Sequence, residues 1–286
     1  MTRRRPAGQR HQSRVANALS LVVIIGGGVV VAFPFYWQVA TSLKAPDRIH
    51  RWPPDWVPWP PHLDNYVELA DVVPLLTYLR NSLLVVSLVV IGTVLSCSLA
   101  AYGFARLRFP GRDVIFLVLI SSMIMPSFAT LIPQFILFQK IGWYNTLYPL
   151  IVPAFFGNAF YIFLLRQFFL TISPEMEDSA RIDGAGFLRT LVYVILPLSK
   201  PAVATVAIFS FVATWNDFFG PLIFLTDQSK FTLPMGLIFF QGNPHAPVQT
   251  HLLMAMAVLL AAPCIALYFV AQRMFIQGIA FTGLKG

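Results

Sequence analysis

The densest group of side chains that could take part in chemistry lies in one polar segment, residues 166–200, between two apolar stretches. Its acids stand close together at Glu175, Glu177 and Asp178. An enzyme active site would need His, Asp or Glu side chains that converge, and a metal site would need Cys and His at ligand spacing. The two Cys and five His of the chain are scattered instead. We therefore expect no catalytic site and no metal site.

These acids are better explained as the start of a helix. Ser173 can cap a helix, Pro174 suits its first position, and carboxylates are favoured near the positive end of the helix dipole. The pattern predicts a helix over 174–183. It should end at Gly184, which can adopt the left-handed conformation that closes a helix. A second helix is predicted over 187–197.

The first of these helices carries the small apolar side chains Met176, Ala180 and Ile182 among polar ones. An amphipathic helix of this kind can dock into a groove on a soluble partner. The chain contains no Gly-x-x-x-x-Gly-Lys-Ser/Thr loop, whose backbone amides and lysine would hold nucleotide phosphates. It therefore cannot hydrolyse ATP by that route.

The composition is that of an integral membrane protein, because 57% of the residues are hydrophobic, 11% are charged and the mean hydropathy is +0.70. About 20 apolar residues in a helix cross the hydrocarbon core. A secretory signal peptide is the alternative for the first apolar stretch, but its apolar region would be only about 7 to 15 residues long. The sequence thus predicts an all-α membrane protein with six transmembrane helices, over 15–43, 81–105, 114–139, 141–165, 201–226 and 250–272.

Most of the 20 Lys and Arg residues flank these spans on one side, which the positive-inside rule assigns to the cytoplasm. The tails 1–14 and 273–286 and the segment 166–200 then lie in the cytoplasm, while the loop 44–80 lies outside. The five-helix core fills 81–272. This topology accounts for most of the net charge of +8, so we predict no nucleic-acid partner.

The segment 166–200 resembles the EAA loop of the permeases of ATP-binding-cassette (ABC) importers. Arg181 to Ala185 and Leu196 to Pro201 match that loop, and Asp178 to Ala180 stands where Glu-Ala-Ala is usual. The resemblance covers nearly the whole chain and is to the carbohydrate-uptake family that includes the maltose transporter. Further matching pieces are Ser42–Lys44, Asn81–Ser82, Ala101–Gly111, Met125–Pro126, Ile132–Pro133, Asn145–Thr146, Trp215–Asp217 and Gly283–Gly286.

The resemblance implies the fold of a type I (MetI-like) importer permease in the bacterial plasma membrane. It implies that the helix and turn over 174–186 couple to a separate ATPase dimer, which binds ATP and Mg, while this chain holds no cofactor. A second homologous permease, forming a heterodimer, and an extracytoplasmic sugar-binding protein are the other implied partners. The residues implied in coupling are Glu175, Glu177, Asp178, Ser179, Ala180, Arg181, Asp183, Gly184, Ala185 and Pro197, with a secondary ATPase contact at Gly283, Leu284, Lys285 and Gly286.

A carboxylate in an apolar stretch marks a second candidate site. Asp217 lies roughly 24 Å along a helix from Pro201, toward the outer end of the fifth span. Because carboxylates in a membrane usually face a polar interior, Trp215, Asn216 and Asp217 could line a translocation path and contact a sugar. Alternatively, Asp217 lies near the outer interface or pairs with a neighbouring helix.

The outer loop is rich in Pro and Trp between Trp52 and Pro61. Dense proline favours a stiff, extended course, and tryptophan favours the membrane interface. A sugar-stacking platform, a dock for an external binding protein and a rigid cap anchored at the headgroups are the alternatives for this loop.

The predicted function is uptake of an oligo- or disaccharide by alternating access, driven by the separate ATPase. The nearest alternative is an ABC permease for another solute, such as glycerol phosphate or a polyamine. An ion-driven secondary transporter would need paired intramembrane ionisable groups and often has an internal repeat. The sequence shows one such acid and no clear repeat.

Overall fold

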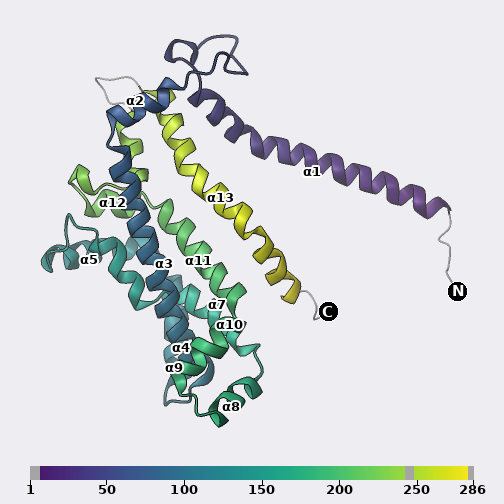
Figure 1. Ribbon diagram of the computed structural model, residues 1–286, viewed down its shortest axis with the longest axis vertical. Coiled ribbons are helices and arrows are strands. Elements are labelled where there is room, and N and C mark those ends of the chain that lie inside the picture. The colour runs from purple at the N-terminus through teal and green to yellow at the C-terminus, as the bar shows by residue number, and fades with distance from the viewer. Residues whose placement is uncertain (1–6, 242–247, 283–286) are drawn as a thin grey trace. The chain divides into compact units, whose positions relative to one another are not determined.

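The computed structural model describes residues 7–241 and 248–282, and every regular element within them is helical (Figure 1). The α-helices are α1 (Ala7–Ser42), α2 (Asp64–Val72), α3 (Leu75–Arg106), α4 (Arg112–Ser121), α5 (Ser127–Lys140), α6 (Tyr148–Ile151), α7 (Ala159–Leu170), α8 (Pro174–Ile182), α9 (Phe187–Thr190), α10 (Leu196–Leu198), α11 (Lys200–Trp215), α12 (Phe219–Phe224) and α13 (Thr250–Thr282). The short elements are η1 (Pro46–Arg48), η2 (Ser122–Ile124), η3 (Val152–Phe156), the π turn η4 (Leu191–Ile195), η5 (Gln228–Lys230) and η6 (Leu233–Phe240).

Helices long and apolar enough to cross a membrane account for most of the described chain. Four of them qualify alone, namely Leu19–Ser42, Leu75–Arg106, Tyr148–Leu170 and Thr250–Gln272. Two bent pairs qualify together, Arg112–Ile124 with Phe128–Lys140 (bent by 102°) and Phe187–Leu198 with Lys200–Trp215 (bent by 85°). If each pair is one span, the described residues form the six spans expected from the sequence.

The breaks within these spans correct the expected helix limits. Met125 and Pro126 separate η2 from α5, because proline lacks an N–H group and restricts the residue before it. The fifth helix ends at Trp215, so the prediction that it continues to residue 226 is wrong. There the Gly220 N–H, which a continuing helix would use, donates instead to the Asp217 carboxylate (3.0 Å).

The second span also begins earlier than expected, at Leu75 instead of Asn81. The sequence analysis took Arg80 as its boundary, but this residue lies in the second turn of α3 with its side chain exposed. A long arginine side chain can keep its charge near water while its helix enters an apolar layer. A single charge near a helix end therefore does not limit a span.

Residues 73–238 and 260–282 form one compact unit, in which α3 is the central helix and packs against α7 and α11. Small side chains on α3, such as Cys97 and Ala101, let its neighbours approach closely. Leu165 and Phe169 of α7 fill the space opposite and are fully buried. In Figure 1, α8 lies beyond the C-terminal end of α3. This central packing positions the candidate site.

Residues 7–72, 239–241 and 248–259 form the other unit. Asn65 of α2 donates hydrogen bonds to the backbone carbonyls of Ser42 (2.8 Å) and Lys44 (2.9 Å), which fastens the end of α1. Burial lowers the pKa of the Lys44 ammonium. In the Pro-rich loop, the Trp52 and Trp59 side chains are largely exposed.

Candidate functional site

Helix α8 begins as its sequence predicts. The Ser173 side chain accepts a hydrogen bond from the Glu175 N–H (3.4 Å), and Pro174 occupies the first helical position. One turn on, the Ser179 hydroxyl donates to the Glu175 carbonyl (2.8 Å). The bond to Ser173 satisfies a backbone N–H that a helix start leaves unpaired, so the sequence itself fixes where α8 begins.

The end of α8 is closed by a Schellman motif. The Ala185 N–H donates to the Ala180 carbonyl (2.9 Å), and the Gly184 N–H donates to the Arg181 carbonyl (3.0 Å). Gly184 adopts a φ of 77°, a left-handed conformation that costs glycine little and other residues more. The predicted stop at Gly184 is confirmed. The second predicted helix also forms, although η4 interrupts it with a π turn.

The Glu177 carboxylate lies at the centre of the site, because its side chain points inward from α8 and is only 4% exposed. Its Oε1 atom forms an ion pair with Arg106 Nε (2.5 Å), and its Oε2 atom accepts a hydrogen bond from the Tyr102 hydroxyl (3.2 Å). Both partners belong to the last two turns of α3. Glu177 therefore holds α8 against the end of the central helix.

Arg106 extends this connection to a third helix. Its Nη2 atom donates to the backbone carbonyls of Phe169 (2.8 Å) and Ile172 (2.6 Å), at the C-terminal end of α7. Carbonyls at a helix end lack partners within the helix and carry the negative end of its dipole, so a guanidinium is favoured there. One arginine thus joins the ends of α3 and α7 to the inner face of α8.

The sequence analysis gave no role to Tyr102 or Arg106. The only indication was that both lie in the Ala101 to Gly111 segment that matches the importer permeases. Sequence spacing could not pair them with Glu177, which lies more than 70 residues further along the chain. The fold brings the three side chains together.

The other residues predicted for coupling lie mainly on the outer surface of the same region. The exposed ones are Glu175, Asp178, Ser179, Arg181, Asp183, Gly184 and Pro197. Ala180 and Ala185 are partly exposed. Glu177, also implied in coupling by the resemblance, is instead buried, and its contacts with Tyr102 and Arg106 anchor α8 to α3. Gly283, Leu284, Lys285 and Gly286 lie outside the described residues.

The three residues predicted for a translocation path diverge in the structure. Trp215 is 1% exposed, and its indole N–H donates to the Leu260 carbonyl (2.9 Å), so its ring does not face an open path. Asn216 is exposed and donates to the Val212 carbonyl (2.8 Å). Asp217 accepts from the Gly220 N–H, as a cap for the turn that starts α12. Asp217 thus has a local structural role.

Comparison with known proteins adds to this geometry. The family model described as "binding-protein-dependent transport system inner membrane component" matches residues 79–281, which include α8 and its whole anchor. The chain belongs to this family. It is therefore an inner membrane permease, and its function is transport.

Relatives along the full length support the same assignment. The permease is 32% identical to the trehalose/maltose transport system permease protein MalG of Thermococcus litoralis, over 94% of this chain and 99% of that protein. It is 29% identical to the sn-glycerol-3-phosphate transport system permease protein UgpE of Brucella abortus, over 95% and 98%. The fold matches a crystal structure of a bacterial ABC transporter involved in the import of the acidic polysaccharide alginate, with a TM-score of 0.80 and 22% identity over 95% of this chain and 99% of that chain.

Replacing Glu177 with Gln should destabilise the permease by about 3–5 kcal/mol, because Arg106 would keep a buried charge without its carboxylate. The matched control is Asp178→Asn, one residue along, whose side chain is 65% exposed and which should change the stability by less than about 0.5 kcal/mol. The measurement is the free energy of unfolding of each purified variant in detergent. Equal stability of the variants would contradict the anchor.

Proposed function

We propose that this permease imports a sugar and that α8 is the helix through which a separate ATPase drives it. The observation that carries this proposal is the combination of an exposed, doubly capped helix with a buried ion pair at its inner face. A force applied to α8 would pass through Glu177 and Arg106 to the ends of α3 and α7. A helix without this anchor would move without its neighbours.

The outer face of α8 has the chemistry of a docking surface. Ile182 is 86% exposed and Met176 is 48% exposed, although both are apolar. Charged residues border them, and Arg181 forms an ion pair with Asp178 (3.5 Å). Apolar residues surrounded by charges are typical of the centre and rim of a protein interface. We infer that a groove on the ATPase covers Ile182.

The assembly that we propose contains an ATPase dimer that binds ATP and Mg, a second homologous permease and an extracytoplasmic sugar-binding protein. In this assembly α8 and both termini face the cytoplasm, as the distribution of Lys and Arg indicates. The closed ATPase dimer would bind the outward-open state of the permease more tightly than the inward-open state and so favour it. ATP hydrolysis would then return the permease to the inward-open state.

The proposed solute is an oligo- or disaccharide. The similarity to a trehalose/maltose permease supports this class, and the similarity to a glycerol-3-phosphate permease keeps that solute as a second candidate. Trp215 is buried and Asp217 caps a turn, so neither side chain favours one of these solutes over the other.

Gly184→Val should uncouple transport from ATP hydrolysis. A β-branched residue at a φ of 77° costs about 1–2 kcal/mol, which distorts the turn after α8 and should lower the rate of uptake roughly tenfold. The control is Gly186→Ala, because Gly186 lies in the same loop at a negative φ with open space beside it. Sugar uptake per ATP hydrolysed is the measurement. Normal coupling in the Val variant would contradict the role of the turn.

Ile182→Asp should weaken binding of the ATPase, because the exposed isoleucine would be replaced by a charge that an apolar groove cannot pair. Losing a buried isoleucine contact costs about 1.5–3 kcal/mol, so the affinity should fall by roughly 10- to 100-fold. Ile182→Val is the conservative control. Co-purification of the ATPase with each variant tests this, and full retention with Asp would show that Ile182 lies outside the interface.

Uptake by vesicles that contain the reconstituted transporter tests the function itself. We expect accumulation of a labelled disaccharide to require ATP and the binding protein and to persist when an ionophore collapses ion gradients. Accumulation of glycerol 3-phosphate instead would identify the second candidate solute. Loss of uptake on ionophore addition with ATP present would contradict an ATP-driven importer.

A further inference from the structure

The helices on either side fix the position of the turn between α3 and α4. It comprises residues 107–111 and joins the end of one membrane-spanning helix to the start of the next apolar helix. So short a turn cannot extend far from the membrane surface. Arg108 and Arg112 can therefore reach the lipid headgroups, because long arginine side chains near the ends of membrane helices extend to the interface.

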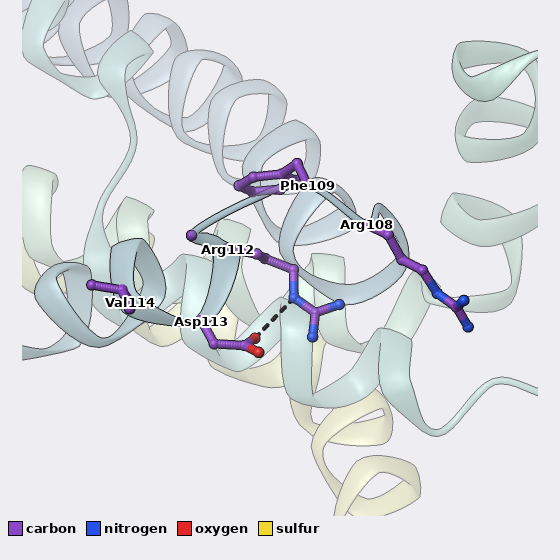
Figure 2. A pocket seen from close by; sticks show the side chains of 6 residues that line it. Arg108, Phe109, Arg112, Asp113 and Val114 are labelled. Atoms are coloured by element: carbon purple, nitrogen blue, oxygen red, sulfur yellow. Dashed lines mark hydrogen bonds and ion pairs between the residues drawn. The ribbon is translucent and has the colours of Figure 1, made fainter.

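A cavity of about 440 Å³ opens at this turn and at the start of α4, as Figure 2 shows. Arg112 is held in place, since its Nε atom bonds to Asp113 (2.9 Å) and its Nη1 atom to the Leu107 carbonyl (3.3 Å). Arg108 extends into the open, and within the described part of the chain it makes no hydrogen bond or ion pair. Its guanidinium donors are available to a ligand.

Positive charge exceeds negative charge around this cavity. Arg166 of α7 lies close enough to Arg112 and Asp113 to interact electrostatically with both. It is held there by a hydrogen bond to the Phe104 carbonyl (3.2 Å) and by the ring of Phe116 (4.1 Å). Asp113 is the one carboxylate that lines the cavity, and it opposes an anion, but it balances only one arginine.

A neighbouring cavity of about 710 Å³ shares Arg108 and Arg112 and reaches α8. Its other arginines have acidic partners, because Arg106 pairs with Glu177 and Arg181 pairs with Asp178. The unbalanced charge is thus concentrated at the α3–α4 turn. It is separate from the charges that anchor α8.

We propose that this turn binds the phosphate of an anionic phospholipid headgroup. A guanidinium can bond to two phosphate oxygens at once, and basic pockets beside transmembrane helices bind anionic headgroups in this way. The acyl chains lie along α4, whose side chains next to the cavity are apolar and exposed, at Val114 (66%), Leu117 (63%) and Val118 (65%). Charge at the turn and apolar surface along the helix together match a lipid better than a free anion.

Native mass spectrometry of the permease, purified with its partner subunits in equal amounts of phosphatidylglycerol and phosphatidylcholine, tests the proposal. We expect the wild type to retain phosphatidylglycerol preferentially. Arg108→Gln should lower this retention about fivefold, and Arg108→Gln with Arg112→Gln roughly 20-fold. Arg108→Gln removes no bond described in the protein, so a folding defect is not expected to obscure its effect. Arg189→Gln, at an exposed arginine of α9, is the control and should change nothing.

Three results would overturn this site. Retention by the double variant equal to that of the wild type would show that the arginines do not bind lipid. Displacement of the lipid by excess inorganic phosphate would show a site for a free anion. Loss of the ATPase from the double variant would show that a protein covers the turn. None of these results bears on which solute is transported, so the site and the proposed function can fail separately.

Discussion

Taking a carboxylate out of water is unfavourable unless a matching charge and hydrogen-bond donors accompany it. Glu177 meets this requirement only where α8 places it against Tyr102 and Arg106, and Arg106 in turn bonds to the end of α7. The position of α8 relative to the central helices thus depends on one buried charge. Any shift of α8 that separates Glu177 from Arg106 would break this buried ion pair and is therefore unfavourable.

The two faces of α8 have different surroundings. The inner face provides the ion pair with α3, and the outer face exposes the apolar side chains of Ile182 and Met176. Local bonds at Ser173 and Gly184 keep the helix intact between them. A short helix in water is unstable by itself, so these caps and the anchor are what make α8 rigid. Rigidity is the property that the proposed coupling through α8 requires.

The membrane restricts the remaining architecture, since unpaired backbone groups are costly in lipid and irregular backbone must be covered by protein. The bends near Pro126 and Ser199 and the break after Trp215 nevertheless interrupt the spans. At the break after Trp215, the Gly220 N–H has no helical partner and donates a hydrogen bond to the Asp217 carboxylate instead. Asp217, for which the sequence analysis considered both a translocation path and a structural position, thus stabilises a break in a helix.

The sequence alone determined the features that depend on neighbours in the chain. The apolar stretches gave the number of spans, and Ser173, Pro174 and Gly184 gave the limits of α8, because capping and left-handed turns are local. The sequence alone could not place the break at residues 216–218, where the Asp217 side chain competes with the backbone for a hydrogen bond. It also could not place the start of α3 at Leu75, because Arg80 stays inside the helix. Only the tertiary structure decided that Glu177 faces inward. Its partners lie on α3, and a buried ion pair exists only when packing brings distant segments together and excludes water.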